Sequence, residues 1–193
     1  MTAISNWLEN RTPEIRQTTS RYNIIMAREV NTLICGVNNR MPWYIVEDLD
    51  YFRQMTMGHT VVMGRNTMES LNAIPLKGRT NVVLSSTMVE APEGFTLLRD
   101  IADVSLLSGK IFFIGGPTLL ASVLQDFVAF PEYNLYLTEI KGIPRIDLPR
   151  KVFLHDIFLF RKFARVTEFT KSGWMRSMHS TTEVNFLGYH IHD

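Results

Sequence analysis

The chain has 193 residues, a length typical of one domain with a single substantial hydrophobic core. Its 20 basic and 19 acidic side chains leave a formal net charge of +1, and no apolar run approaches the roughly 18–20 residues of a membrane span, so neither nucleic acid nor a membrane is an expected partner. Cys35 is the only cysteine, which excludes an intrachain disulfide and a cysteine-based metal site, and with no signal peptide evident we expect a cytoplasmic protein.

Residues 1–20 are expected to form an N-terminal extension, for which the sequence indicates no function. The segment is polar apart from Ile4, Trp7, Leu8 and Ile15. A short helix docked on the surface and a disordered terminus are both compatible with this pattern. We expect the folded domain to cover residues 21–193.

From Tyr22 onward, short apolar runs alternate with segments of helical periodicity. The apolar runs are predicted to be strands buried on both faces, at 22–27, 60–63, 81–84, 95–98, 110–114 and 135–140. Helices are predicted at about 45–57, 65–72, 100–107 and 117–127. This alternation favours an α/β fold with a mainly parallel sheet. Near the end, 161–170 and 182–191 are predicted to be two strands, joined across 171–173, that pair antiparallel at the edge of the sheet.

The helix predicted at 45–57 carries the most informative side chain, Asp48. Pro42 comes just before this segment, where its fixed φ and missing N–H suit the start of a helix. Asp48 lies beside Leu49 at the edge of the apolar face, and a buried carboxylate there either finds a partner or shifts its pKa. The alternative is an exposed acid in the first turn that favours the helix dipole, the role expected of Glu47 and Asp50. The spacing alone leaves both interpretations of Asp48 open.

Several sequence blocks follow one another in the order seen in one enzyme family. The first is Gly36, a short loop, Met41-Pro42-Trp43, and then Asp48, Leu49 and Phe52. The later blocks are VVMGRNTMESL (61–71), PLKGRTNVVLSS (75–86), IFFIGGPTLL (111–120) and LYLTEI (135–140). Together they resemble dihydrofolate reductase over roughly residues 22–191, strongly to residue 140 and weakly afterwards. The resemblance implies an eight-stranded, mixed and mainly parallel sheet flanked by about four helices, with an antiparallel C-terminal edge strand.

Residues suited to phosphate binding follow several of the predicted strands. Arg65 stands where a strand gives way to a helix, so free N–H groups and a guanidinium are both available to a phosphate. An exposed surface arginine is the simpler explanation when Arg65 is taken alone. Ser85, Ser86 and Arg99 end the next two strands, and ligands of open α/β sheets bind at that edge. The pair Gly115-Gly116 permits close approach of the backbone to a ligand, although a simple strand-to-helix turn would also use it.

The resemblance implies that the cofactor is NADPH. It assigns the adenosine side to Arg65, Thr67, Ser85, Ser86 and Arg99, which favour the 2′-phosphate over a bare ribose. The other cofactor-binding residues it implies are Ala27, Cys35, Gly36, Met41, Gly64, Asn66, Leu84, Ile114, Gly115, Gly116, Pro117, Thr118 and Leu119. The loop of residues 36–41 is implied to be a lid over the nicotinamide, with Met41 and Trp43 at its hinge.

The same resemblance implies a folate pocket. Arg79 has the planar guanidinium that suits a carboxylate, and it is assigned the α-carboxylate of the substrate's glutamate tail, assisted by Arg53. The implied lining of the pterin and benzoyl pocket is Met26, Leu49, Phe52, Leu71, Leu76 and Ile114, for which ordinary core packing is the alternative. The hydroxyl of Thr138 is implied to be the partner of Asp48.

The implied reaction is NADPH-dependent reduction of 7,8-dihydrofolate to 5,6,7,8-tetrahydrofolate, by hydride transfer to C6 and protonation of N5. The catalytic candidates are Asp48, Thr138 and Trp43, and Asp48 is expected to anchor the 2-amino group and N3 while it favours protonation of N5 by water. We expect dihydrofolate as the partner, a monomer or homodimer, and no metal. The histidines show no metal-site spacing and are interpreted as surface or structural residues: His59, His155, His179, His190 and His192.

Some positions depart from the family pattern, and two alternative functions stay open. Arg28 replaces a small or apolar residue, Cys35 an aliphatic one and Leu120 an aromatic one, and a late Asp-Thr-X-Phe-Pro block is reduced to IDLP at 146–149. The first alternative is a related reductase acting on another heterocycle, such as the aminopyrimidine intermediates of riboflavin synthesis. The second is a non-enzymatic module that retains only the fold. The related reductase would not require Asp48, Thr138 and Arg79 together. The non-enzymatic module would not need both the phosphate-binding positions and the carboxylate of Asp48.

Overall fold

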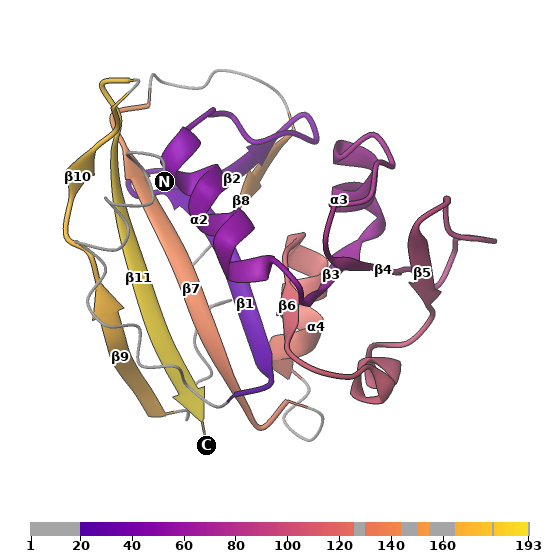
Figure 1. Ribbon diagram of the computed structural model, residues 1–193. Helices are drawn as coiled ribbons and strands as arrows, with labels where there is room; N and C mark the ends of the chain where they lie inside the picture. The colour runs from indigo at the N-terminus through magenta and orange to yellow at the C-terminus, as the bar shows by residue number, and fades with distance from the viewer. Residues whose placement is uncertain (1–19, 126–129, 144–149, 155–164, 179, 193) are drawn as a thin grey trace.

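A large mixed sheet forms the centre of the computed structural model, which describes residues 20–125, 130–143, 150–154, 165–178 and 180–192 (Figure 1). Its strand order is β10-β11-β7-β1-β6-β3-β4-β5, and β9 also pairs with β11. The strands are β1 (Tyr22–Glu29), β3 (Thr60–Gly64), β4 (Thr80–Leu84), β5 (Phe95–Leu98), β6 (Ile111–Phe113), β7 (Glu132–Lys141), β9 (Arg165–Lys171), β10 (Met175–Arg176) and β11 (Glu183–His192). The apolar runs predicted as strands at 22–27, 60–63, 81–84, 95–98, 110–114 and 135–140 all lie in this sheet.

Strand directions in the sheet follow the predicted pattern. The pairs β1–β6, β1–β7, β3–β6, β3–β4 and β4–β5 are parallel, whereas β11 runs antiparallel to both β7 and β9. The predicted pairing of the last two long strands is therefore confirmed. However, β11 lies inside the sheet between β7 and β9, and β10 interrupts the connection expected across 171–173. The start of the predicted strand, 161–164, lies outside the described residues.

Helices cover both faces of the sheet. They are α2 (Val46–Thr56), α3 (Arg65–Ser70), α4 (Pro117–Gln125) and a 3₁₀ helix, η1 (Ile101–Leu106), where a regular helix had been predicted over 100–107. One core cluster joins Ile45 and Tyr51, from α2 and its N-cap, to the face of the sheet that carries Val61 and Tyr136. The other cluster joins α4 to the opposite face, so α2 and α4 lie on opposite sides of the sheet (Figure 1). No helix among the described residues is long and apolar enough to cross a membrane.

The start of α2 differs from the sequence prediction in two respects. Pro42 does not begin the helix, because the first helical residue is Val46 and its N-cap is Ile45, which makes no side-chain cap hydrogen bond. Glu47, predicted to be an exposed acid, is only 1% exposed. Its carboxylate accepts hydrogen bonds from Ser177 and Met178, which lie 130 and 131 positions further along the chain. Local periodicity carries no information on partners so distant.

A small second sheet was not predicted at all. It pairs β2 (Ile34–Val37) antiparallel with β8 (Lys151–Phe153). The lid expected over 36–41 is thus partly a hairpin, closed by mutual backbone hydrogen bonds of 2.8 and 3.0 Å between Val37 and Arg40. Asn38 and Asn39 both have positive φ, at 48° and 61°, as a type I′ turn requires. The expected N-terminal extension up to residue 19 and the reduced block at 146–149 lie outside the described residues.

Candidate active site

A cavity of about 880 Å³ opens where β1, β3, β4 and β6 reach their carboxyl ends. Ligands of open α/β sheets bind at this edge. The predicted site residues that line the cavity are Met26, Ala27, Cys35, Gly36, Met41, Asp48, Leu49, Phe52, Arg53, Gly64, Arg65, Asn66, Thr67, Leu71, Leu76, Arg79, Leu84, Ser85, Ser86, Arg99, Ile114, Gly115, Gly116, Pro117, Thr118 and Leu119. Trp43 and Thr138, also predicted, are not among the lining residues.

Asp48 is a buried carboxyl group in the first turn of α2, with 7% of its surface exposed. Burial raises its pKa from 3.8 to about 6, against the opposing effect of hydrogen bonding from the side chains of Thr138 and Trp43. The indole N–H of Trp43 reaches no acceptor at regular hydrogen-bond geometry in the described part of the chain, so its effect on the carboxyl group is that of a nearby donor. Thr138 is buried in β7, paired in register with Ala27 of β1. Asp48 is therefore the buried acid of the cavity and is mostly ionised at neutral pH, whereas Asp100, the other acidic side chain in the lining, is exposed.

Apolar side chains surround Asp48 on the walls of the cavity. Phe52 comes from α2, Leu71 and Leu76 from the segment after α3, and Ile114 from the end of β6. All are partly buried, and each packs against the core behind it while it faces the cavity. Both interpretations offered by the sequence, core packing and pocket lining, therefore apply to these residues.

Two arginines lie at the same end of the cavity as Asp48. The Nη1 of Arg79 donates to Thr56 Oγ1 at 3.3 Å, while its Nε is buried and has no hydrogen-bond partner among the described residues. Burial lowers the pKa of Arg79, and the positive charge of Arg53 lowers it further. Two neighbouring cations with an unused donor favour an anionic group of a ligand, and a carboxylate fits a guanidinium best.

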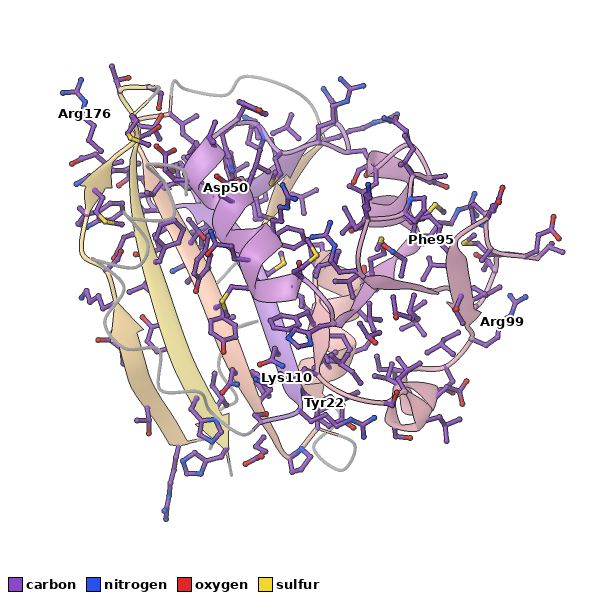
Figure 2. The ribbon with its side chains drawn as sticks, viewed as in Figure 1. Tyr22, Asp50, Phe95, Arg99, Lys110 and Arg176 are labelled. Atoms are coloured by element: carbon purple, nitrogen blue, oxygen red, sulfur yellow. The ribbon has the colours of Figure 1, made fainter. Side chains whose placement is uncertain are left out.

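Cations also occur at the other end of the cavity, where they are exposed. Arg65 Nε pairs with Glu69 Oε1 at 2.7 Å, with both side chains about half exposed. Arg99, at the end of β5 on the outer edge of the sheet (Figure 2), donates to the carbonyls of Met88 and Val89. Ser85 Oγ accepts from the backbone N–H of Met88 at 3.2 Å. Arg99 and Ser85 thus hold the loop after β4 while they line the cavity.

The turn between β6 and α4 brings bare backbone to the cavity. Gly115 has φ +134°, in the region that disfavours other residues, and a Cβ there would lie 3.2 Å from Thr67 Oγ1. Its carbonyl accepts from Gly64 N–H at 2.9 Å, and its peptide bond to Gly116 is cis. The end of β3 and the turn after β6 are therefore joined here by a backbone hydrogen bond between glycines, and α4 begins directly afterwards.

The residues that depart from the family pattern lie in different environments. The Cys35 thiol lines the cavity and donates to the Val152 carbonyl at 3.5 Å, and burial raises its pKa to about 11. Arg28 is buried and pairs with Glu139 at 3.0 Å. Leu120 is fully buried in the core and does not line the cavity.

Some lining residues were missed from the sequence: Ile25, Asn39, Arg40, Ser70, Asp100, Ile101, Ser122 and Val152. The lid prediction already contained Asn39 and Arg40, and Asp100 follows the predicted Arg99, so position along the chain was a usable signal. Val152 comes from β8, a strand that no local pattern in the sequence indicates. Among the described residues, no group of histidine, cysteine or acidic side chains is arranged to hold a metal. His59 packs against Phe112, whereas His155 and His179 lie outside the described residues.

Comparisons with known proteins agree on one family. The sequence profile described as dihydrofolate reductase matches residues 21–153. Dihydrofolate reductase of Staphylococcus aureus (strain Mu50) is 35% identical over 125 residues, which are 65% of this chain and 74% of that protein. The enzyme of Ureaplasma parvum serovar 3 is 36% identical over 104 residues, covering 47% of this chain and 67% of that protein. The solved structure of Enterococcus faecalis dihydrofolate reductase complexed with NADP(H) and RAB-propyl shares this fold, with a TM-score of 0.70, 22% identity, and coverage of 89% of this chain and 96% of that one. The chain belongs to the dihydrofolate reductase family.

Proposed function

We propose that this chain reduces 7,8-dihydrofolate to 5,6,7,8-tetrahydrofolate with NADPH, by hydride transfer to C6 and protonation of N5. One observation carries the proposal: a buried acid and exposed cations line opposite ends of one cavity. An aminopteridine with a basic edge suits the acid, and a phosphorylated nucleotide suits the cations. Membership of the family supports the same assignment.

The cofactor end of the cavity fits NADPH. The bare backbone at Gly115, where a Cβ would meet Thr67, leaves room for a diphosphate at the start of α4. Arg65 and Arg99 offer guanidinium groups to a 2′-phosphate, together with the hydroxyls of Ser85 and Ser86. When bound, NADPH supplies the hydride.

Asp48 is the residue on which the chemistry depends. Its carboxylate accepts hydrogen bonds from the 2-amino group and N3 of the pterin and so fixes the ring. A negative charge in an apolar pocket also favours a proton on N5, which water delivers. Because the pKa of Asp48 is about 6, the carboxylate is mostly ionised at neutral pH and accepts these bonds. The Thr138 hydroxyl orients it, Trp43 lies close to it as a nearby donor, and the hairpin at Val37–Arg40 helps to exclude water.

Arg79 holds the far end of the substrate. Its Nε, which has no acceptor in the described part of the chain, offers a forked contact to the α-carboxylate of the glutamate tail, and the nearby charge of Arg53 assists it. The apolar walls formed by Phe52, Leu71 and Leu76 accommodate the benzoyl group between the two polar anchors.

The test is the oxidation of NADPH, followed by its absorbance, with 7,8-dihydrofolate as the other substrate. We expect turnover that depends on both compounds and that falls in an Asp48→Asn variant. An aminopyrimidine intermediate of riboflavin synthesis serves as the matched alternative substrate. Turnover of that compound without turnover of dihydrofolate would replace the proposed function with the related reductase. Absence of turnover with both would support a binding module.

A further inference from the structure

Glu47 is a buried carboxylate beside the catalytic acid for which the proposed mechanism has no use. Only 1% of its surface is exposed. Its Oε2 accepts from Ser177 Oγ at 3.0 Å, and its Oε1 accepts from the backbone N–H of Met178 at 2.8 Å. A buried carboxylate is costly unless it is hydrogen-bonded, and bonds to a charged acceptor are stronger than neutral ones. Glu47 is therefore a strong link between α2 and the turn that follows β10.

This link holds a helix start that has no side-chain cap of its own. The N-cap residue Ile45 makes no side-chain hydrogen bond, and Tyr44 before it is 79% exposed. Successive residues of a helix point about 100° apart, so Glu47 can face the turn while Asp48 faces the cavity. The turn after β10 lies at the same end of the molecule as the start of α2 (Figure 1).

The described residues that flank this turn are hydrogen-bonded to each other and to the sheet. Ser177 N–H donates to the Thr182 carbonyl at 2.8 Å, and β10 pairs with the start of β11. Strand β11 then runs beside β7 along its whole length, where Phe186 pairs with Thr138. Glu47 and Thr138 are thus both tied to the β7–β11 pair, one through the turn and the other as part of β7. Asp48 follows Glu47 directly in the first turn of α2 and interacts with the side chain of Thr138.

We propose that Glu47 is a positioning residue: by fixing the first turn of α2 to the turn after β10, it keeps the Asp48 carboxylate beside Thr138 and at the pterin site. This inference rests on the proposed function, because it assigns the link to the substrate end of the same cavity. Asp48, Leu49, Phe52 and Arg53 all lie on α2 and line that end. The cofactor end is built from α3, α4 and the ends of β4 and β5. Loosening the start of α2 must therefore weaken dihydrofolate binding and leave NADPH binding unchanged.

The experiment compares Glu47→Ala with Glu47→Gln. The alanine removes both hydrogen bonds. The glutamine restores them, because its carbonyl oxygen accepts from Met178 N–H and its amide donates to the Ser177 hydroxyl. The matched control is Glu183→Gln, which breaks the exposed 2.9 Å pair with Lys141 at the start of β11 but does not reach α2. Dissociation constants for dihydrofolate and NADPH are measured by fluorescence titration, and single-turnover hydride transfer by stopped flow.

For Glu47→Ala we expect dihydrofolate affinity and hydride transfer each to fall about tenfold, the scale of one lost bond to a charged group, with NADPH affinity within about twofold of wild type. Glu47→Gln and Glu183→Gln should stay within about threefold of wild type in all three measurements. Unchanged dihydrofolate affinity in Glu47→Ala would overturn the proposal, and so would an equal loss of NADPH affinity or failure of glutamine to restore binding. Wild-type turnover is measured first: its absence overturns the proposed function and the positioning role with it, whereas an active wild type with an unaffected alanine variant overturns only the latter.

Discussion

The two ends of the active-site cavity differ in how far water reaches their charged groups. At the substrate end, the acid is buried beneath apolar side chains, and its pKa is raised to about 6. At the cofactor end, Arg65 is about half exposed and pairs with Glu69 one helical turn away, while Arg99 is exposed on the edge of the sheet. A buried charge acts at low dielectric, whereas an exposed one is screened by water and salt.

This difference predicts how strongly each end responds to mutation. Changes to the buried acid should alter rate, stability and pH dependence together, because desolvation dominates its energetics. Changes to the exposed arginines should have smaller effects, which depend on salt and fall mainly on cofactor choice.

Asp48→Asn should lose ~2–4 kcal/mol of transition-state stabilisation at neutral pH, the scale of a general acid or a preorganised electrostatic group. The amide keeps the size and much of the hydrogen bonding but cannot favour a proton on N5. Single-turnover hydride transfer measures the loss, and NADPH binding serves as the control for an intact fold. A loss below about threefold would show that the buried charge of Asp48 does not contribute to the chemical step.

The same carboxyl group should make stability depend on pH. Its pKa is about 6 in the folded protein against an ordinary value of 3.8, so between these values the folded state binds more protons than the unfolded state. The free energy that this group contributes to stability is therefore greatest below about pH 4 and is lost as the pH rises through 6. The loss is ~3 kcal/mol, because each unit of pKa difference between the folded and unfolded states corresponds to ~1.36 kcal/mol. Asp48→Asn should remove this component and be more stable than wild type above pH 6. Urea titrations of both proteins at several pH values provide the measurement, and parallel stability curves would contradict the prediction.

Arg79→Lys should weaken dihydrofolate binding by ~2–3 kcal/mol, because an ammonium cannot reproduce a forked pair with a carboxylate. NADPH affinity should barely change. Fluorescence titration of each ligand separates the two effects. Intact dihydrofolate binding in this variant would mean that the glutamate tail is held elsewhere.

Arg65→Ala should weaken NADPH by about 1–2 kcal/mol and NADH far less, since only NADPH carries the 2′-phosphate. Helix α3 itself should lose little stability, because an exposed i,i+4 pair such as Arg65–Glu69 contributes only ~0.3–0.5 kcal/mol. The loss should shrink at high salt. Steady-state KM values for both cofactors test the prediction, and an equal loss for both would exclude Arg65 from cofactor choice.

Sequence reasoning predicted the features that depend on short stretches of chain. The strands that end at the cavity, the helix carrying Asp48 and the glycine turn at 115–116 each have a local pattern, so their positions were predictable. Glu47 and the β2–β8 sheet were not, because their partners lie more than a hundred residues away along the chain. The exposure expected of Glu47 was wrong for the same reason. The roles of individual site residues remain predictions, since periodicity cannot separate a core side chain from one that lines a pocket.

The most direct test of Asp48 as the buried charge of the site is the pH dependence of single-turnover hydride transfer, from about pH 5 to 9, in wild type and Asp48→Asn. As the pH falls, more dihydrofolate arrives already protonated, so the variant should speed up by about tenfold per pH unit and approach wild type in acid. The wild-type rate should depend less steeply on pH, because the carboxylate favours the proton on N5 within the site. A variant as fast as wild type at neutral pH, or one that slows on acidification while it stays folded, would contradict the role of Asp48.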